Sequence, residues 1–176
     1  MEAITLLKPT TEYSEDIMQF RQELLDANDA DSFAGCGSLR QCQTAEEWIQ
    51  ALEKMESVDT CPSGSVPSNT YIAVRLSDNR IVGVIDLRHH IDHPILGLWG
   101  GHMGYTVRPS ERRKGYAVEM LKQNLGKCRE RGMDKVMITC SRDNPASEKV
   151  IIANDGIFEK EVLVDGDYVK RYWIML

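Results

Sequence analysis

The chain has 176 residues, of which 42% are hydrophobic and 27% are charged, a balance typical of one folded domain rather than a disordered chain. Acidic residues outnumber basic ones by 27 to 21, so the net charge of −6 disfavours a basic nucleic-acid-binding domain while leaving room for a local basic patch. No apolar stretch reaches the roughly 18 residues of a membrane span, and residues 1–10 lack the pattern of a secretory signal. The five cysteines form an odd set without a Cys-x-x-Cys pair, which indicates neither a disulfide framework nor a cysteine zinc site. These features predict a cytoplasmic, soluble protein with one domain over residues 1–176.

The first half of the chain combines a short strand, two amphipathic helices and a hairpin. Alternation of apolar residues predicts a strand over residues 3–7. Apolar residues at helical spacing predict one helix capped by Thr11 and a second helix that begins at Thr44. Period-two patterns then predict a β-hairpin with strands over residues 71–76 and 80–88.

The second half alternates strands with helices. A strand is predicted over residues 101–107, followed by the strongest helix of the chain over residues 115–131, which Gly132 is well placed to end. A buried strand over 135–140, a helix over 144–154 and a closing hairpin over 157–164 and 168–175 follow. This order predicts a mixed α/β sheet with a parallel pair of strands on either side of the long helix.

Chemistry is most clearly indicated where the strand ending at Val107 gives way to the long helix. A helix start leaves backbone N–H groups unpaired and carries the positive end of the helix dipole, so it favours an anion. Gly115 and Ala117 keep the turn free of large side chains, and four positive charges lie on Arg108, Arg112, Arg113 and Lys114. The pattern predicts a phosphate-binding site, and the alternative is a solvated basic loop that caps an ordinary helix.

The same residues resemble the GNAT N-acetyltransferases. The spacing Arg112-x-x-Gly115-x-Ala117 matches the acyl-CoA signature of that family, Arg/Gln-x-x-Gly-x-Gly/Ala, and Val107-x-Pro109 matches the strand end before it. Downstream, Asn144 with Ser147 and then Gly156-Ile157-Phe158 resembles the family's Asn-x-x-Ala/Ser…Gly-Phe segment. The resemblance is closest over residues 101–158, and the run at 101–109 is similar to that of a bacterial branch.

The resemblance implies a GNAT-like fold, a single domain with a mixed, mostly antiparallel central sheet flanked by helices. It implies acetyl-CoA as co-substrate, no metal, and direct transfer of the acetyl group to a primary amine of a small molecule or peptide. Family habit adds a homodimer, without nucleic-acid or membrane partners. The residues implied to bind acetyl-CoA are Tyr105, Thr106 and Val107 on the pantetheine arm, with Asn144 beside it, and the backbone amides of Arg113, Lys114, Gly115, Tyr116 and Ala117 on the pyrophosphate, next to Arg112.

The catalytic groups depart from the family pattern. Many members place a tyrosine, taken as the acid that protonates the thiolate, seven residues after the asparagine, whereas this chain has Ile151 there. Ser147 is a candidate substitute, or a structural residue of the first helical turn. His102 is a candidate base, or a partly buried strand residue bonded to backbone. Without a clear acid, a non-catalytic acyl-CoA-binding sensor is the alternative function.

A second group of polar residues follows the strand at 80–88. His89, His90 and His93 lie in a loop without an obvious fourth ligand, which favours a polar loop over a metal site. Residues 86–96 are candidates for the wall of the acceptor pocket. The chain contains no GxxxxGK[ST], GxGxxG, GxSxG or HExxH pattern, so NTPase, dinucleotide oxidoreductase, serine hydrolase and zincin functions have no support.

Overall fold

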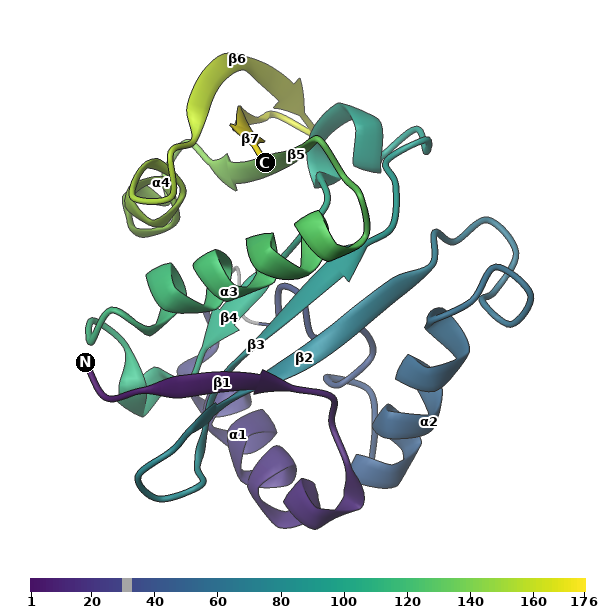
Figure 1. The fold of residues 1–176 in the computed structure, drawn as a ribbon, viewed down its shortest axis with the longest axis vertical. Coiled ribbons are helices and arrows are strands. Elements are labelled where there is room, and N and C mark those ends of the chain that lie inside the picture. Colours follow the sequence, from purple (N-terminus) through teal and green to yellow (C-terminus); the bar gives the residue numbers. More distant parts are fainter. Residues whose placement is uncertain (30–32) are drawn as a thin grey trace.

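The computed structural model describes residues 1–29 and 33–176 and contains two β-sheets (Figure 1). The larger sheet has the strand order β1-β2-β3-β4, with β1 Ile4–Leu7, β2 Ser68–Arg75, β3 Ile81–Arg88 and β4 Tyr105–Val107. The smaller sheet has the order β5-β7-β6, with β5 Lys135–Ser141, β6 Ile157–Val164 and β7 Asp167–Met175. All pairings recorded between these strands are antiparallel.

Helices cover both faces of the larger sheet. Figure 1 shows α1 and α2 on one side of it, α3 across the other side, and α4 beside the smaller sheet. The bounds of these helices are α1 Ser14–Ala27, α2 Ala45–Met55, α3 Tyr116–Glu130 and α4 Pro145–Ile152. Shorter helical turns occur at Thr11–Tyr13, Leu96–Gly100 and Pro109–Glu111.

Each face of the larger sheet contributes to its own apolar core. Trp48 of α2 and Phe20 of α1 are buried against one face, together with Ile72 and Val84 of the sheet. The opposite face packs against α3 and extends to the smaller sheet, with these members: Ile85, Leu87, Met120, Leu121, Ile138 and Ile174. A strand covered on both faces needs a nearly continuous apolar run, which explains the Ile-Val-Gly-Val-Ile segment of β3.

The helix starts were only partly predicted. Thr44 caps α2 as expected, because its side chain accepts the Glu47 N–H at 3.2 Å. Thr11 does not cap α1: one 3₁₀ turn comes first, and α1 begins at Ser14. Such turns are common at the start of α-helices, and apolar periodicity alone does not distinguish them from the helix itself.

The expected parallel pair of strands is wrong, although the mixed α/β architecture of antiparallel strands flanked by helices is confirmed. Within the described residues β4 pairs with β3 and β5 pairs with β7, so the two strands joined by α3 lie in different sheets. The strand expected over 101–107 is also reduced to Tyr105–Val107. Gly101 has a φ of +67°, and the N–H of Gly104 bonds to the Asp86 side chain instead of the ladder.

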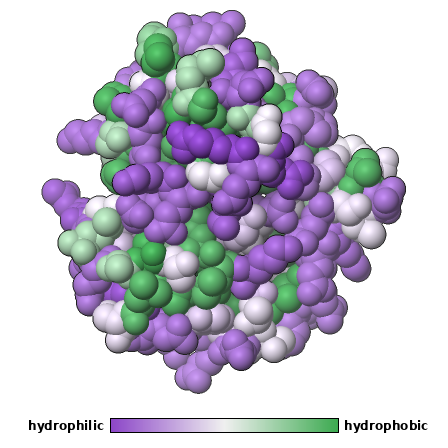
Figure 2. Space-filling view, viewed as in Figure 1, coloured by the Kyte–Doolittle hydropathy of each residue, from purple (hydrophilic) through white to green (hydrophobic). Residues whose placement is uncertain are grey.

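The surface is mostly hydrophilic on the face seen in Figure 2, with hydrophobic residues near the top, over β6. Ile157, Phe158 and Leu163 of β6 are exposed. Among the described helices, none combines the length and the apolar character that crossing a membrane would take.

Candidate active site

The loop between β4 and α3 has the backbone of an anion site. Arg113 and Gly115 have φ values of +63° and +87°, so the chain turns twice through the left-handed region before α3 begins at Tyr116. Across the described residues, the backbone amides of 113–117 donate to no recorded protein acceptor, and no side chain caps the helix. Together with the helix dipole, these amides can hold a phosphate group.

The charges around this loop differ from the expectation. Arg108 is fully buried, and its guanidinium bonds to Asp16 at 2.6 Å and to Glu23 at 2.7 Å, so it offers no charge to a ligand. The exposed charges are those of Arg112, Arg113 and Lys114. Arg112 pairs with Asp29, and Lys114 pairs with Glu111 at 2.8 Å. The four basic residues therefore differ in their surroundings. Arg108 is a buried structural residue, whereas Arg112, Arg113 and Lys114 face the solvent.

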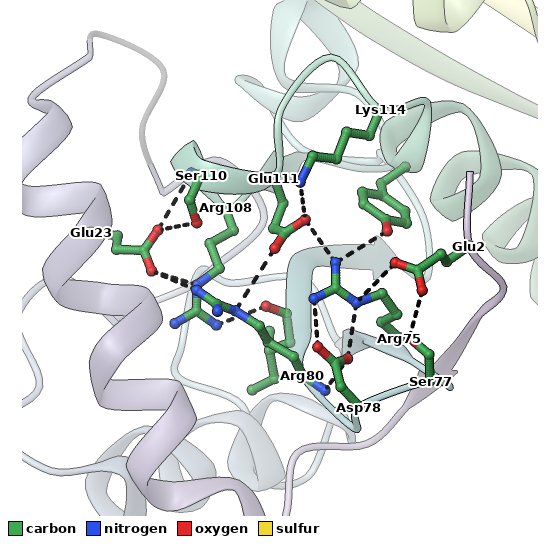
Figure 3. Close-up of polar contacts among 12 residues, drawn as sticks. Glu2, Glu23, Arg75, Ser77, Asp78, Arg80, Arg108, Ser110, Glu111 and Lys114 are labelled. Carbon is green, nitrogen blue, oxygen red and sulfur yellow. Dashed lines mark hydrogen bonds and ion pairs between the residues drawn. The ribbon is translucent and has the colours of Figure 1, made fainter.

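A polar network holds the turn that precedes residues 113–117, the loop in which a phosphate site is predicted and which is called the phosphate loop below (Figure 3). Glu111 is buried, and one of its carboxylate oxygens accepts from Arg75 and from Lys114, each at 2.8 Å. Burial raises the pKa of Glu111, but the hydrogen bonds from Lys114 and Arg75 outweigh it and lower the pKa overall. On the other side of the turn, the Ser110 hydroxyl donates to Glu23 at 2.7 Å. The turn before the loop is thus joined to β2 and to α1.

One edge of β4 faces no other described strand, and the only bond recorded there among the described residues comes from Arg112 Nε, which donates to Val107 C=O at 3.4 Å. Arg108 N–H donates to Val82, and Asp86 N–H donates to Gly104, so the even-numbered residues of this segment face β3. Alternate residues of a strand direct their backbone groups to opposite sides, so those of Tyr105 and Val107 point away from β3. Because β4 is the last strand of its sheet, this edge has no strand partner among the described residues. An extended ligand can add to it as a strand would.

His102, just before β4, is hydrogen-bonded to β5. Its backbone N–H donates to Met137 C=O at 2.8 Å, and its ring Nδ1 accepts the Met137 N–H at 2.9 Å. Burial lowers its pKa to about 4, so the ring is neutral at physiological pH. The ring nitrogen able to accept a proton, Nδ1, is therefore already bonded to the backbone of Met137. This geometry favours a structural role for His102, which links the segment before β4 to β5, over a role as catalytic base.

The first turn of α4 meets β4. Asn144 caps α4 by accepting the Ser147 N–H at 3.0 Å, and the hydroxyls of Ser147 and Tyr105 lie 2.7 Å apart. Burial raises the pKa of Tyr105, so its hydroxyl stays protonated. Ile151 is fully buried in the core and faces no polar group of this kind. The structure thus brings Asn144, Ser147 and Tyr105 together.

Other predicted residues have separate positions. The Thr106 hydroxyl donates to Ala34 C=O at 2.8 Å, on the opposite face of the sheet from Tyr105, and the Tyr116 side chain is buried. The three histidines do not converge: His89 bonds to Asn69, while His90 and His93 accept backbone N–H groups of their own loop. No cluster of three or more metal-ligating side chains occurs in residues 1–29 and 33–176.

Sequence reasoning missed the buried Asn124 beside β4, and it named residue 86 only as the start of a candidate wall of the acceptor pocket, not as a buried residue that bonds to backbone. Asp86 interrupts the apolar run of β3, and Asn124 lies on the buried face of α3. A carboxylate in a strand buried on both faces and an amide in a helix stripe are both rare, and that rarity was the available signal. Both residues bond at the start of β4.

Comparisons with known proteins agree with this geometry. Residues 4–155 match the acetyltransferase (GNAT) domain family. A search of curated protein sequences finds no match. A solved ribosomal L7/L12 alpha-N-protein acetyltransferase in complex with coenzyme A is similar with a TM-score of 0.69 and 18% identity, covering 98% of this chain and 94% of that one. The microcin C7 self immunity acetyltransferase with acetyl-CoA and AMP has a TM-score of 0.66 and 16% identity, covering 98% and 92%. A spermidine N-acetyltransferase chimera from Vibrio cholerae and hSSAT has a TM-score of 0.63 and 14% identity, covering 98% and 94%.

Proposed function

The chain belongs to the GNAT acetyltransferase family, and on that premise we propose that it transfers an acetyl group from acetyl-CoA directly to a primary amine of a small molecule or peptide. The observation that carries the proposal is that two backbone elements able to bind a ligand, a strand edge and a loop of unbonded amides, follow one another along the chain. The edge of β4 at Tyr105 and Val107, which has no strand partner among the described residues, leads into a loop whose amides at 113–117 are unbonded within the described chain. An extended arm followed by a pyrophosphate fits that order.

The residues at each element would bind different parts of acetyl-CoA. Amides of residues 113–117 would hold the pyrophosphate, with Arg112 and Arg113 adding charge at the surface. The β4 edge would bind the pantetheine arm through backbone bonds, and Asn144 would flank it at the start of α4. The Cβ of a residue at 115 would have only Met1 atoms within 4 Å, the nearest at 3.4 Å, so the turn is open for a ligand.

Coenzyme A, when bound, supplies the acetyl thioester. A backbone N–H of the β4 edge would donate to the thioester carbonyl and stabilise negative charge on its oxygen. The Ser147 hydroxyl, bonded to that of Tyr105, would donate the proton that the departing sulfur requires. The amine nitrogen forms the new bond to the acetyl carbon as the carbon–sulfur bond breaks, and the proton that the amine loses passes to solvent water, from which Ser147 regains its proton. Of the predicted catalytic residues, Ser147 therefore keeps a proposed role in proton transfer, while His102 is proposed as the residue that joins β4 to β5.

The acceptor is proposed only as a primary amine. The structural relatives are described as acting on the α-amino group of a ribosomal protein and on spermidine, which are amines of very different size. The homodimer stays a prediction of the resemblance and the cytoplasmic location a prediction of the sequence composition, and light scattering after size-exclusion chromatography tests the first.

Two measurements test the proposed function. Calorimetry with acetyl-CoA should give a one-site binding isotherm, and a thiol assay over a panel of polyamines, aminoglycosides and peptides should detect release of coenzyme A with at least one amine. Binding without release on every amine would favour the alternative, a non-catalytic acyl-CoA sensor. Failure to bind acetyl-CoA would refute both.

A further inference from the structure

The backbone N–H of Gly104, immediately before β4, leaves the ladder, although the C=O groups of His102 and Gly104 still accept from β3. Asp86 N–H donates to Gly104 C=O at 3.1 Å, which is one of the two bonds that opposed residues exchange in an antiparallel pair. The second bond is replaced: Gly104 N–H donates to Oδ1 of the Asp86 side chain at 2.5 Å. The C=O of Asp86 instead accepts from Nδ2 of Asn124 on α3, at 2.9 Å. Two side chains therefore take the place of one backbone bond.

Both side chains are buried, and burial makes this arrangement costly. Asp86 is 8% exposed and Asn124 is 0% exposed. A buried carboxylate is tolerated only when its charge and lone pairs have partners, which here are the Gly104 N–H and the Arg88 guanidinium at 3.2 Å. An apolar residue at position 86 would continue the β3 run without that cost. A buried carboxylate in a strand that otherwise carries apolar residues indicates that the position of the Gly104 backbone has to be fixed.

Gly104 is also confined from the opposite face of the sheet. A Cβ on Gly104 would lie 2.7 Å from the Gly35 nitrogen, so the loop after α1 touches the backbone directly. Asp86 and Asn124 hold the Gly104–Asp86 pair from the β3 side, and Gly35 closes the space on the other. The chain enters β4 at Tyr105 from a position that these contacts fix.

We propose that Asp86 is a positioning residue that, together with Asn124, sets the backbone of β4 where it binds the pantetheine arm of acetyl-CoA. This inference rests on the proposed function and assigns it a residue that does not touch the ligand. The bond from Gly104 N–H to the carboxylate replaces one ladder bond and fixes the backbone one residue before the edge at Tyr105 begins. A ligand that adds to this edge then meets backbone groups already in place, and preorganisation of this kind favours binding.

Two ligands and three variants test the proposal. Coenzyme A contacts both elements, whereas adenosine 3′,5′-bisphosphate lacks the pantetheine arm and reaches only the phosphate loop. Asp86→Ala removes the acceptor of Gly104, Asp86→Asn keeps an acceptor oxygen, and Asp134→Ala is the matched control because Asp134 is exposed, in the turn between α3 and β5. Calorimetry gives both affinities for each protein.

Asp86→Ala should weaken coenzyme A binding about tenfold and leave adenosine 3′,5′-bisphosphate binding within twofold of wild type. Asp86→Asn should restore most of the lost coenzyme A affinity, and Asp134→Ala should match wild type with both ligands. Equal losses for the two ligands would indicate a merely structural role and overturn the proposal, as would an unchanged affinity for coenzyme A. If wild type itself fails to bind coenzyme A, the proposed function is refuted instead.

Hydrogen exchange of the wild-type protein provides a test that does not depend on Asp86→Ala folding. The Gly104 amide should exchange slowly in the free protein and at the same rate with coenzyme A bound, because its bond to Asp86 exists beforehand. Fast exchange that becomes slow only with the ligand would overturn the proposal.

Discussion

Replacing Gly115 by glutamate tests the phosphate loop most directly. Gly115 has a φ of +87°, and an L-residue in the left-handed region costs roughly 1–2 kcal/mol, which a relaxing loop would avoid by leaving its binding geometry. A Cβ would have its nearest contact at 3.4 Å, to Met1, so simple overlap contributes little. The added carboxylate would repel the pyrophosphate by about 1 kcal/mol per close charge pair in water. The sum is a loss of at least about 2 kcal/mol, or roughly thirtyfold in acetyl-CoA affinity.

Calorimetry with acetyl-CoA measures this loss, and far-UV circular dichroism should be unchanged because the loop is exposed. Gly132→Glu is the matched control: Gly132 follows the same helix, has a φ of +74°, and a Cβ there would meet no atom within 4 Å. It adds the same charge and similar strain away from the loop, so its affinity should stay within twofold of wild type. An affinity of Gly115→Glu within twofold of wild type would refute the site and the function argued from it.

Four further outcomes follow from the same geometry. Arg112→Ala should weaken acetyl-CoA binding by only about threefold, since an exposed charge contributes modestly and the amides remain; a loss as large as that of Gly115→Glu would contradict this. Ser147→Ala should lower kcat about a hundredfold with little change in acetyl-CoA affinity, and steady-state kinetics giving an unchanged kcat would remove Ser147 from the chemistry. Arg108→Ala should lower the free energy of unfolding by about 3 kcal/mol in urea denaturation, because it removes a fully buried guanidinium with its ion pairs to Asp16 and Glu23, and an unchanged midpoint would show that these ion pairs are dispensable. Hydrogen bonds from Arg75 lower the pKa of Asp78 from 3.8 to about 2, so its carboxylate stabilises the fold fully above pH 3.8 and progressively less as the pH falls to 2. Urea midpoints of Asp78→Asn should therefore depend less on pH than those of wild type in that window, and parallel profiles would contradict the linkage.

The loop with unbonded amides between β4 and α3 was predictable because its features are local, and phosphate binding there stays a prediction. A glycine, a helix start and a strand end within a few residues determine where free amides occur. The role of Arg108 was not predictable in the same way. Its partners Asp16 and Glu23 lie 92 and 85 residues away in the chain, so the basic run could not reveal which of its charges is buried.

The strand before the loop shows the same limit. Alternation over 101–107 indicated one strand, whereas the structure keeps only Tyr105–Val107. Two tertiary contacts decide this difference. His102 N–H bonds to Met137 of β5, and Gly104 N–H bonds to the Asp86 side chain, so both N–H groups leave the ladder while both C=O groups still accept from β3. The helix α3 was predicted well because its long apolar stripe depends on nothing outside the helix.

The buried polar residues cluster at the two ends of β4. Asp86 and His102 fix its start, and Arg108 and Glu111 fix its end. A strand is usually positioned by ladders on both sides, but β4 has a ladder on one side only. An unpaired edge is free to bind, yet without a second ladder its position would be poorly determined. Side-chain bonds at both ends supply that constraint without covering the edge, so most of the ordering cost of the strand is met during folding rather than during binding. Because these bonds are made by residues far apart in the sequence, the affinity of the β4 edge for a ligand depends on the whole fold. Substitutions at the start of β4 should therefore weaken binding of the pantetheine arm, and substitutions at its end should weaken binding at the phosphate loop.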